Sequence, residues 1–169
     1  MTDEETTPFP ANAIHLIRTA QQIHVQLSGM ADQKASILMG ASFVIFTLAI
    51  REAETARPPL PLLILGASAF LAAVCAALAV VPAVRVRGGG KVNLLFFGSF
   101  AQLDEEDFLD RITDVMRSDE AACRAMALDL YQNGCVLARK KYRLLGWAYR
   151  IFLLGMTAAL AAFIVQYLR

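Results

Sequence analysis

The stretch that decides the fold reads RKKYRLLGWAYRIFLLGMTAALAAFIVQYL and covers residues 139–168. Before it, from Ser118, the sequence has a polar helical pattern, and from Trp147 to Leu168 it is an apolar run without acidic residues. That run is long enough for a helix to cross about 30 Å of hydrocarbon, which takes roughly 20 residues. The sequence therefore predicts one helix that leaves the cytosol at the basic cluster and enters a membrane.

Two further apolar blocks precede this run. Leu60–Val84 has no acidic residue and is long enough to span, whereas Ala35–Ile50 is slightly shorter than the usual minimum of about 17 residues. By length alone, the shorter block could be a buried core helix. A span is favoured because Leu60–Val84 needs a hydrophobic partner and a short polar hairpin can join the two blocks. In addition, Lys34 and Arg51 can extend from the block's ends toward the headgroups.

Hydrophobic residues make up 57% of the chain, more than the about 45–50% of a typical soluble domain. The net charge of +1 does not predict nucleic acid binding. The basic residues that flank the second and third apolar blocks are Arg85, Arg87, Lys91, Arg139, Lys140, Lys141 and Arg143. Because cytoplasmic loops are enriched in Lys and Arg, this segment is predicted to be cytoplasmic. The N-terminus is then cytoplasmic and the C-terminus external.

We therefore expect an all-α membrane protein, with three transmembrane helices and a small cytosolic helical unit formed by the N-terminal helix and the segment between spans two and three. The expected divisions are a disordered tail at 1–11, a cytosolic amphipathic helix at 12–34, the first span at 35–51, an external hairpin at 52–59, the second span at 60–84, a cytosolic helical region at 85–145 and the third span at 146–168. No disulfide framework is expected from Cys75, Cys123 and Cys135.

Charged and small residues in or next to the spans suggest where helices contact each other. Asp32 and Lys34 lie where the first span begins, either as interfacial anchors or as partners of another helix. Gly146 is a candidate hinge at the start of the third span. Small residues recur at four-residue spacing, which predicts close helix packing within one chain or between chains. These rows are Ser36 with Gly40, Ala69 with Ala73 and Ala77, and Gly155 with Ala159.

The sequence offers little support for an enzyme. His15 and His24 do not have the spacing of a helical metal pair, and the acidic run after Asp104 is explained as capping of a helix that ends near Arg117. The glycine-rich stretch 85–91 is not a Walker loop, since Val92 follows the lysine. We expect no cofactor, no metal and no catalytic residue. The glycine-rich stretch is interpreted as a flexible basic turn, and the alternative is a turn that holds an anionic ligand or lipid headgroup.

The apolar segment Val92–Phe100 is too short to span a membrane, so it is predicted either to be buried against the cytosolic helices or to lie at the interface. Together with two other blocks it suggests a family. The blocks are DQKAS at 32–36, NLLFFGS at 93–99 and KKYRLL at 140–145. Over about residues 11–165 the chain resembles the membrane effectors of Pycsar antiphage systems, called PycTM.

The resemblance implies a bacterial inner-membrane effector that is paired with a pyrimidine nucleotide cyclase. Cyclic UMP or cyclic CMP would activate it, and membrane damage would then cause abortive infection. The candidate ligand contacts are basic or amide groups expected to face the cytosol, and the positive-inside rule alone also accounts for the basic ones. They are Arg85, Arg87, Lys91, Asn93, Arg139 and Lys140. A homo-oligomer is expected, because three helices can hardly enclose a pore. The alternative is a non-catalytic scaffold subunit that binds no nucleotide.

Overall fold

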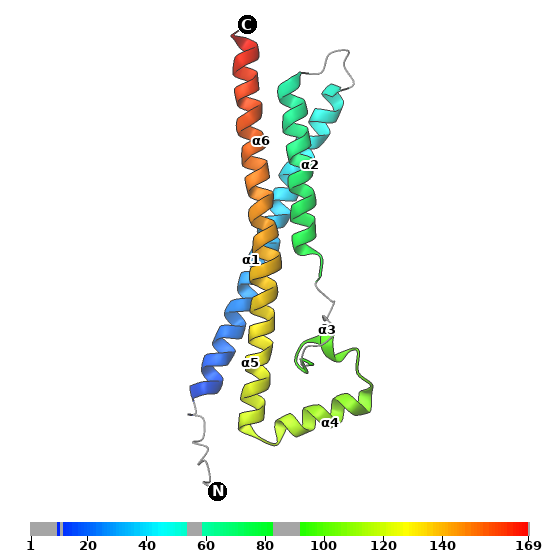
Figure 1. Cartoon of the computed structure of the whole chain (residues 1–169), viewed down its shortest axis with the longest axis vertical. Coiled ribbons are helices and arrows are strands. Elements are labelled where there is room, and N and C mark those ends of the chain that lie inside the picture. Colours follow the sequence, from blue (N-terminus) through cyan, green and yellow to red (C-terminus); the bar gives the residue numbers. More distant parts are fainter. Residues whose placement is uncertain (1–9, 11, 54–58, 83–91, 169) are drawn as a thin grey trace. The chain divides into compact units, whose positions relative to one another are not determined.

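The computed structural model describes residues 10, 12–53, 59–82 and 92–168, and every regular element in these ranges is helical (Figure 1). The elements are α1 (Asn12–Ala53), α2 (Leu60–Val80), α3 (Phe97–Phe100), α4 (Glu105–Met116), α5 (Asp119–Val136), the π-helix η1 (Leu137–Tyr142) and α6 (Arg143–Tyr167). The predicted tail at 1–11 and hairpin at 52–59 lie largely outside the described residues, as does the end of the predicted second span at Val84.

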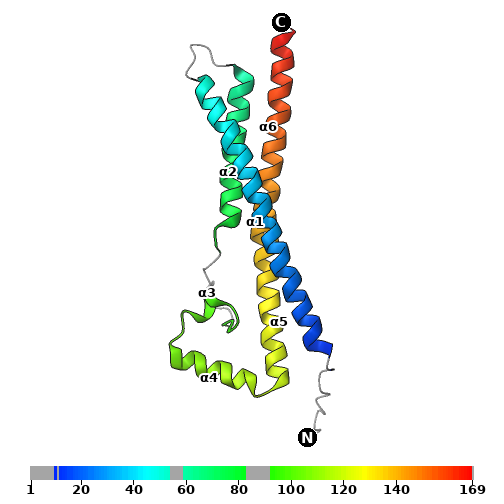
Figure 2. The same ribbon diagram turned by 180° about the vertical axis from the view of Figure 1, so that it is seen from behind.

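Three helices are long and apolar enough to cross a membrane: α1, α2 and the helical stretch Asp119–Tyr167 that contains α5, η1 and α6. The predicted all-helical fold with three such helices is therefore confirmed. The first span is not a separate helix, since α1 runs without a break through the predicted amphipathic and apolar segments, as the view from behind also shows (Figure 2). α2 ends at Val80, shortly before Pro82, which has no N–H to continue the helix.

The chain divides into two compact units. The first unit comprises the described parts of Met1–Gln26 and Pro82–Val136, and the second comprises those of Leu27–Val81 and Leu137–Arg169. In the first unit, α4 begins after Asp104 and carries acidic residues in its first turn, as predicted, but the Asp104 side chain forms no capping hydrogen bond. α5 begins after Ser118, whose Oγ accepts a hydrogen bond from the backbone N–H of Ala121.

The second unit packs through small side chains. Its core consists of buried Ala31, Ala35, Leu38, Ala76, Leu145 and Ala148. On α6, the predicted pair Gly155 and Ala159 is buried, and Gly155 faces Ser68 of α2 so closely that a Cβ there has no room. Close backbone approach through small residues is how helices associate in lipid, where tails are as apolar as side chains.

The other two predicted rows of small residues do not form the packed faces. Ser36 and Gly40 are exposed on α1, and on α2 Ala77 is exposed and Ala73 only half-buried. Of the predicted α2 row only Ala69 is buried, and the buried positions on this helix are Pro61, Gly66, Ala69, Ala72, Ala76 and Ala79. Steps of four residues drift around a helix that has 3.6 residues per turn, whereas alternating steps of three and four stay on one face. On α1 and α2 the four-residue spacing therefore pointed to the wrong register, whereas on α6 it identified a buried pair.

Candidate functional site

The sequence-predicted ligand residues fall into three groups. Arg85, Arg87 and Lys91 lie outside the described residues. Asn93 belongs to the first unit, and Arg139 and Lys140 belong to the second. The described candidates therefore belong to two different units of the chain.

Asn93 is the centre of a buried polar cluster in the first unit. It is only 1% exposed, and its backbone and side-chain polar groups form hydrogen bonds within the chain. Its Nδ2 donates to Oδ1 of Asp129 at 3.0 Å, and its own Oδ1 accepts from the N–H of Leu95 at 2.9 Å. Its backbone N–H donates to Oγ of Ser99 at 2.9 Å. Asn93 thus fixes the short segment that leads into α3 and ties it to α5.

Asp129 on α5 accepts hydrogen bonds from three side-chain amides. Besides Asn93, Nε2 of Gln21 on α1 donates to its Oδ2 at 2.9 Å, and Nδ2 of Asn133 donates to its Oδ1 at 2.9 Å. The residue is 8% exposed, and no ion pair to it is found among the described residues. Burial of a carboxylate is costly unless it is hydrogen-bonded, so these neutral donors stabilise Asp129 in place of a cation. We call these residues, Gln21, Asn93, Ser99, Asp129 and Asn133, the amide cluster.

Sequence reasoning selected Asn93 but missed the rest of the amide cluster. Gln21, Asp129 and Asn133 lie in ordinary helical patterns, where polar residues are expected on a solvated face. The i, i+4 spacing of Asp129 and Asn133 is a weak hint of a local contact, but it also occurs on many exposed helices. The buried carboxylate could be found only from tertiary structure.

In the second unit, two consecutive residues of η1 form hydrogen bonds with α1. Lys141 Nζ lies 2.7 Å from both carboxylate oxygens of Asp32 and 2.7 Å from Oγ of Ser28. The hydroxyl of Tyr142 donates to the backbone carbonyl of Leu27 at 3.3 Å. The side chain of Lys141 is 17% exposed and that of Asp32 39%, so water screens the pair only partly.

The other predicted residues of this unit differ in surroundings. Lys140 Nζ donates to the carbonyl oxygen of Val81 at 2.6 Å, where a cation is favourable because α2 has its negative end there. Arg139 is exposed. Lys34 is exposed too, and its backbone carbonyl accepts from the hydroxyl of Tyr149 at 3.3 Å. Gly146 lies inside α6 with open space around the position of a Cβ.

The departure from α-helical geometry is η1 and not Gly146. A π-helical turn is rare and needs tertiary contacts to persist. Here the contacts come from three successive residues, Lys140, Lys141 and Tyr142, which bind α1 and α2. The coupling roles expected for Asp32, Lys34 and Gly146 stay predictions.

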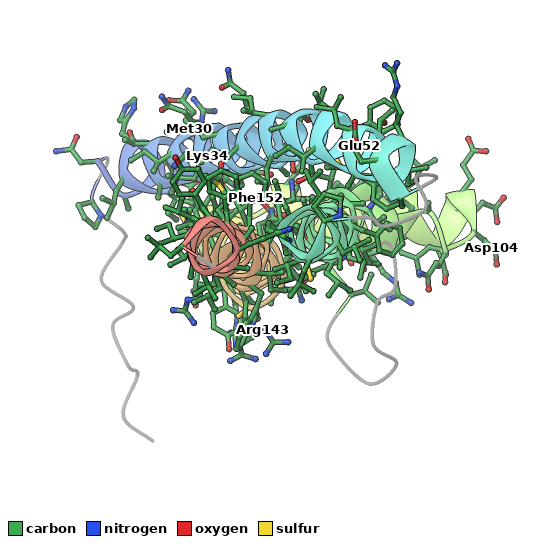
Figure 3. The ribbon with its side chains drawn as sticks, turned by 90° about the horizontal axis from the view of Figure 1, so that it is seen from above. Met30, Lys34, Glu52, Asp104, Arg143 and Phe152 are labelled. Carbon is green, nitrogen blue, oxygen red and sulfur yellow. The ribbon has the colours of Figure 1, made fainter. Side chains whose placement is uncertain are left out.

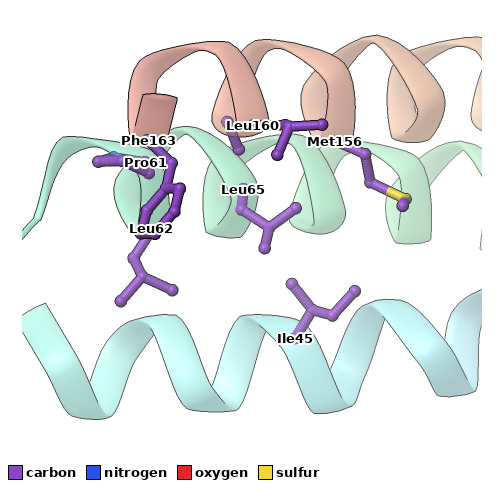
Figure 4. A pocket seen from close by; sticks show the side chains of 8 residues that line it. Ile45, Pro61, Leu62, Leu65, Met156, Leu160 and Phe163 are labelled. Atoms are coloured by element: carbon purple, nitrogen blue, oxygen red, sulfur yellow. The ribbon is translucent and has the colours of Figure 1, made fainter. Parts of the chain in front are cut away.

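The second unit also has an apolar hollow between α1, α2 and α6 (Figure 4). Its lining residues are Ile45, Pro61, Leu62, Leu65, Met156, Ala159, Leu160 and Phe163. None of these side chains carries a polar group that could recognise a phosphate or a base. The hollow lies within the apolar helices, so we do not assign it to a nucleotide.

Comparison with known proteins agrees with this architecture. The Pycsar effector protein domain, PycTM, matches residues 15–167. The chain belongs to the PycTM family. This confirms the family resemblance of the sequence and implies an antiphage effector that pairs with a cyclase signal. PycTM proteins are membrane effectors and not a known catalytic family. Among curated proteins and solved structures, no match to the chain was found.

Proposed function

We propose that this PycTM chain is activated by cyclic UMP or cyclic CMP and then impairs the bacterial inner membrane, so that the infected cell stops growing before phage matures. The observation that carries this proposal is the match of the Pycsar effector domain to nearly the whole chain. The three helices that are long and apolar enough to span a membrane support a membrane target. The chain acts as a homo-oligomer, because three helices are too few to enclose a pore.

The proposed orientation places the first unit in the cytosol, where a cyclase would release the nucleotide. The basic residues next to the predicted ends of the second and third spans support this orientation. A ligand can shift the equilibrium only if it binds the active state more tightly than the resting one. The nucleotide site is proposed at Arg85, Arg87, Lys91 and Asn93, with Arg139 and Lys140 as further candidates.

The amide cluster gives Asn93 a specific place in this proposal. A ligand that takes the N–H which Asn93 Nδ2 donates to Oδ1 of Asp129 displaces that hydrogen bond, and a pyrimidine ring carries carbonyl groups that can accept it. Loss of that donor leaves a buried carboxylate with two amides instead of three. Each oxygen of Asp129 then keeps one amide donor, and loss of a hydrogen bond to a charged group costs about 1.5–3 kcal/mol, enough to favour a rearrangement of α5.

The proposed relay to the membrane uses Asp32, Lys34 and Gly146. Asp32 supports it because its partner Lys141 belongs to η1, which continues directly into α6. A change of geometry at η1 therefore acts on a helix that is apolar enough to span. Lys34 adds a second contact through its carbonyl and Tyr149.

A binding titration tests the proposal. Purified protein in nanodiscs is titrated with cyclic UMP and cyclic CMP, with cyclic AMP as the control. We expect saturable binding of at least one cyclic pyrimidine and none of the purine. Asn93→Ala should weaken that binding, whereas Gln26→Ala on the exposed side of α1 should not.

A scaffold subunit that binds no nucleotide is the second candidate. It is favoured by one observation, namely that the buried side-chain amide of Asn93 already donates to Asp129 and accepts from Leu95 within the chain. In that case the titration shows no saturable binding of either cyclic pyrimidine, and the chain co-purifies with another membrane protein.

A further inference from the structure

The basic cluster at the start of α6 is split into two chemically different sets. Lys140 and Lys141 bind Val81, Ser28 and Asp32 within the chain. Arg139, Arg143 and Arg150 are exposed, and none of them forms an ion pair or hydrogen bond with a described residue. The lysines thus stabilise the fold, whereas the arginines remain available to a ligand.

The arginines share a helix face with an exposed tryptophan. Arg139, Arg143, Trp147 and Arg150 follow one another at steps of four, four and three residues, which places them in a row along η1 and α6. Figure 3 shows Arg143 directed away from α1 and α2. Trp147 is 53% exposed. We call these four residues the arginine row.

The row lies where α6 becomes apolar. Leu153 and Leu154 follow it and are 58% and 70% exposed, as expected for side chains that face hydrocarbon. Trp147 fits the headgroup level of a bilayer, because its ring is apolar and its N–H can donate. The guanidinium of Arg150 lies 5.5 Å from the centre of the Trp147 ring, so it reaches back toward the headgroups from one turn deeper.

We propose that the arginine row binds the headgroup phosphate of an anionic phospholipid. Guanidinium groups bind phosphate oxygens in a bidentate manner, which ammonium groups cannot do. Clusters of cations beside a membrane helix attract anionic lipids. Three arginines that have no ion pair among the described residues, together with a tryptophan on the same face, match a phosphate that is held at the membrane surface. This inference goes beyond the proposed nucleotide response. The two share Arg139 as a candidate contact, and the displacement step below distinguishes them.

Trp147 is the single tryptophan of the chain, so its fluorescence reports on the row directly. The protein is reconstituted in vesicles of brominated phosphatidylcholine, which quenches tryptophan, mixed with unlabelled phosphatidylglycerol or unlabelled phosphatidylcholine. If the row prefers the anionic lipid, phosphatidylglycerol should restore the fluorescence more than an equal amount of phosphatidylcholine does. We expect roughly fivefold loss of this preference for each arginine removed.

Three double variants define the result. Arg139→Ala with Arg143→Ala should abolish the preference, while Arg111→Ala with Arg117→Ala, an equal charge change on α4, should leave it unchanged. Arg139→Lys with Arg143→Lys keeps the charge and should still reduce the preference, because the bidentate contact is lost.

Three outcomes would overturn the proposal. The first is equal recovery with both unlabelled lipids, and the second is a preference that survives in the double alanine variant. The third is displacement of phosphatidylglycerol by added cyclic UMP or cyclic CMP. A nucleotide is also a phosphodiester, so displacement would assign the arginine row to the nucleotide instead. Absence of nucleotide binding alone leaves the lipid result intact, because the assay contains no nucleotide until the last step.

Discussion

At the scale of single residues, one buried and one partly buried polar contact join distant parts of the chain. In the first unit, Asp129 is held by amides and by no cation, and in the second unit Asp32 is held by the ammonium group of Lys141. The first arrangement depends on complete hydrogen bonding, because each lost donor leaves charge buried without compensation. The second depends on an opposite charge and is partly screened by water.

Asn93→Asp should destabilise the first unit in a pH-dependent way. The new carboxylate replaces an amide that lies 3.0 Å from Asp129 Oδ1, and two adjacent carboxylates cannot both ionise without repulsion. One carboxyl pKa of the pair is then raised in the folded state, so stability is lost as the pH rises above the unfolded value. Thermal unfolding should show a lower Tm at pH 8 than at pH 5. Gln26→Glu, on an exposed position, should show no such difference, and an equal loss at both pH values would contradict the repulsion.

The ion pair of Lys141 predicts a coupling between two positions. Lys141→Ala leaves Asp32 without its cation in a partly buried place and should cost about 1–3 kcal/mol. Asp32→Ala combined with Lys141→Ala should cost less than the sum of the single changes, because the second change removes a charge already left unpaired. Unfolding in mixed micelles measures the three values. Strict additivity would show that the two side chains do not interact.

At the scale of elements, the described helices combine features that the sequence predicts with features that only packing decides. The α4 helix follows from Asp104 and the acidic first turn, and the apolar lengths of α1, α2 and α6 follow from composition. Composition does not predict which face of each helix is buried, because that depends on the neighbouring helix against which it packs. The π-helix is likewise invisible in the sequence, because its contacts come from Ser28, Asp32 and Val81, which are distant along the chain.

Two glycines of α6 should respond in opposite ways to alanine. Gly155→Ala introduces a Cβ against Ser68 and should destabilise the packing of α2 on α6 by about 1–3 kcal/mol. Gly146→Ala has open space around it and should stabilise the helix by up to about 1 kcal/mol. Unfolding in SDS-containing micelles compares the two.

If Gly146 is the hinge, Gly146→Ala should also reduce the response to nucleotide; an unchanged response would reject the hinge.

At the scale of the whole molecule, the chain combines three membrane-length helices with a small polar unit that belongs to the same PycTM domain. The sequence was sufficient for the family and the helical class, because both depend on local composition and short motifs. The candidate site was only partly predictable. Asn93 was selected as an amide group expected to face the cytosol, whereas its partners Gln21 and Asp129 required tertiary structure.

The proposed orientation can be checked separately from function. Fusion of alkaline phosphatase to the C-terminus should give an active enzyme, because that end is predicted to be external, and a green fluorescent protein fusion there should remain dark. Fusions at the N-terminus should give the reverse result. Bright fluorescence at the C-terminus would contradict the orientation, and it would also place the first unit on the wrong side for a cytosolic nucleotide.

The most direct test of the central claim is a measurement of membrane integrity with the purified chain. Proteoliposomes that hold a potassium diffusion potential and a potential-sensitive dye are exposed to cyclic UMP, cyclic CMP or cyclic AMP. We predict rapid depolarisation with at least one cyclic pyrimidine, no change with cyclic AMP, and a weakened response for Asn93→Ala. A membrane potential that persists at saturating concentrations of both cyclic pyrimidines would contradict the account.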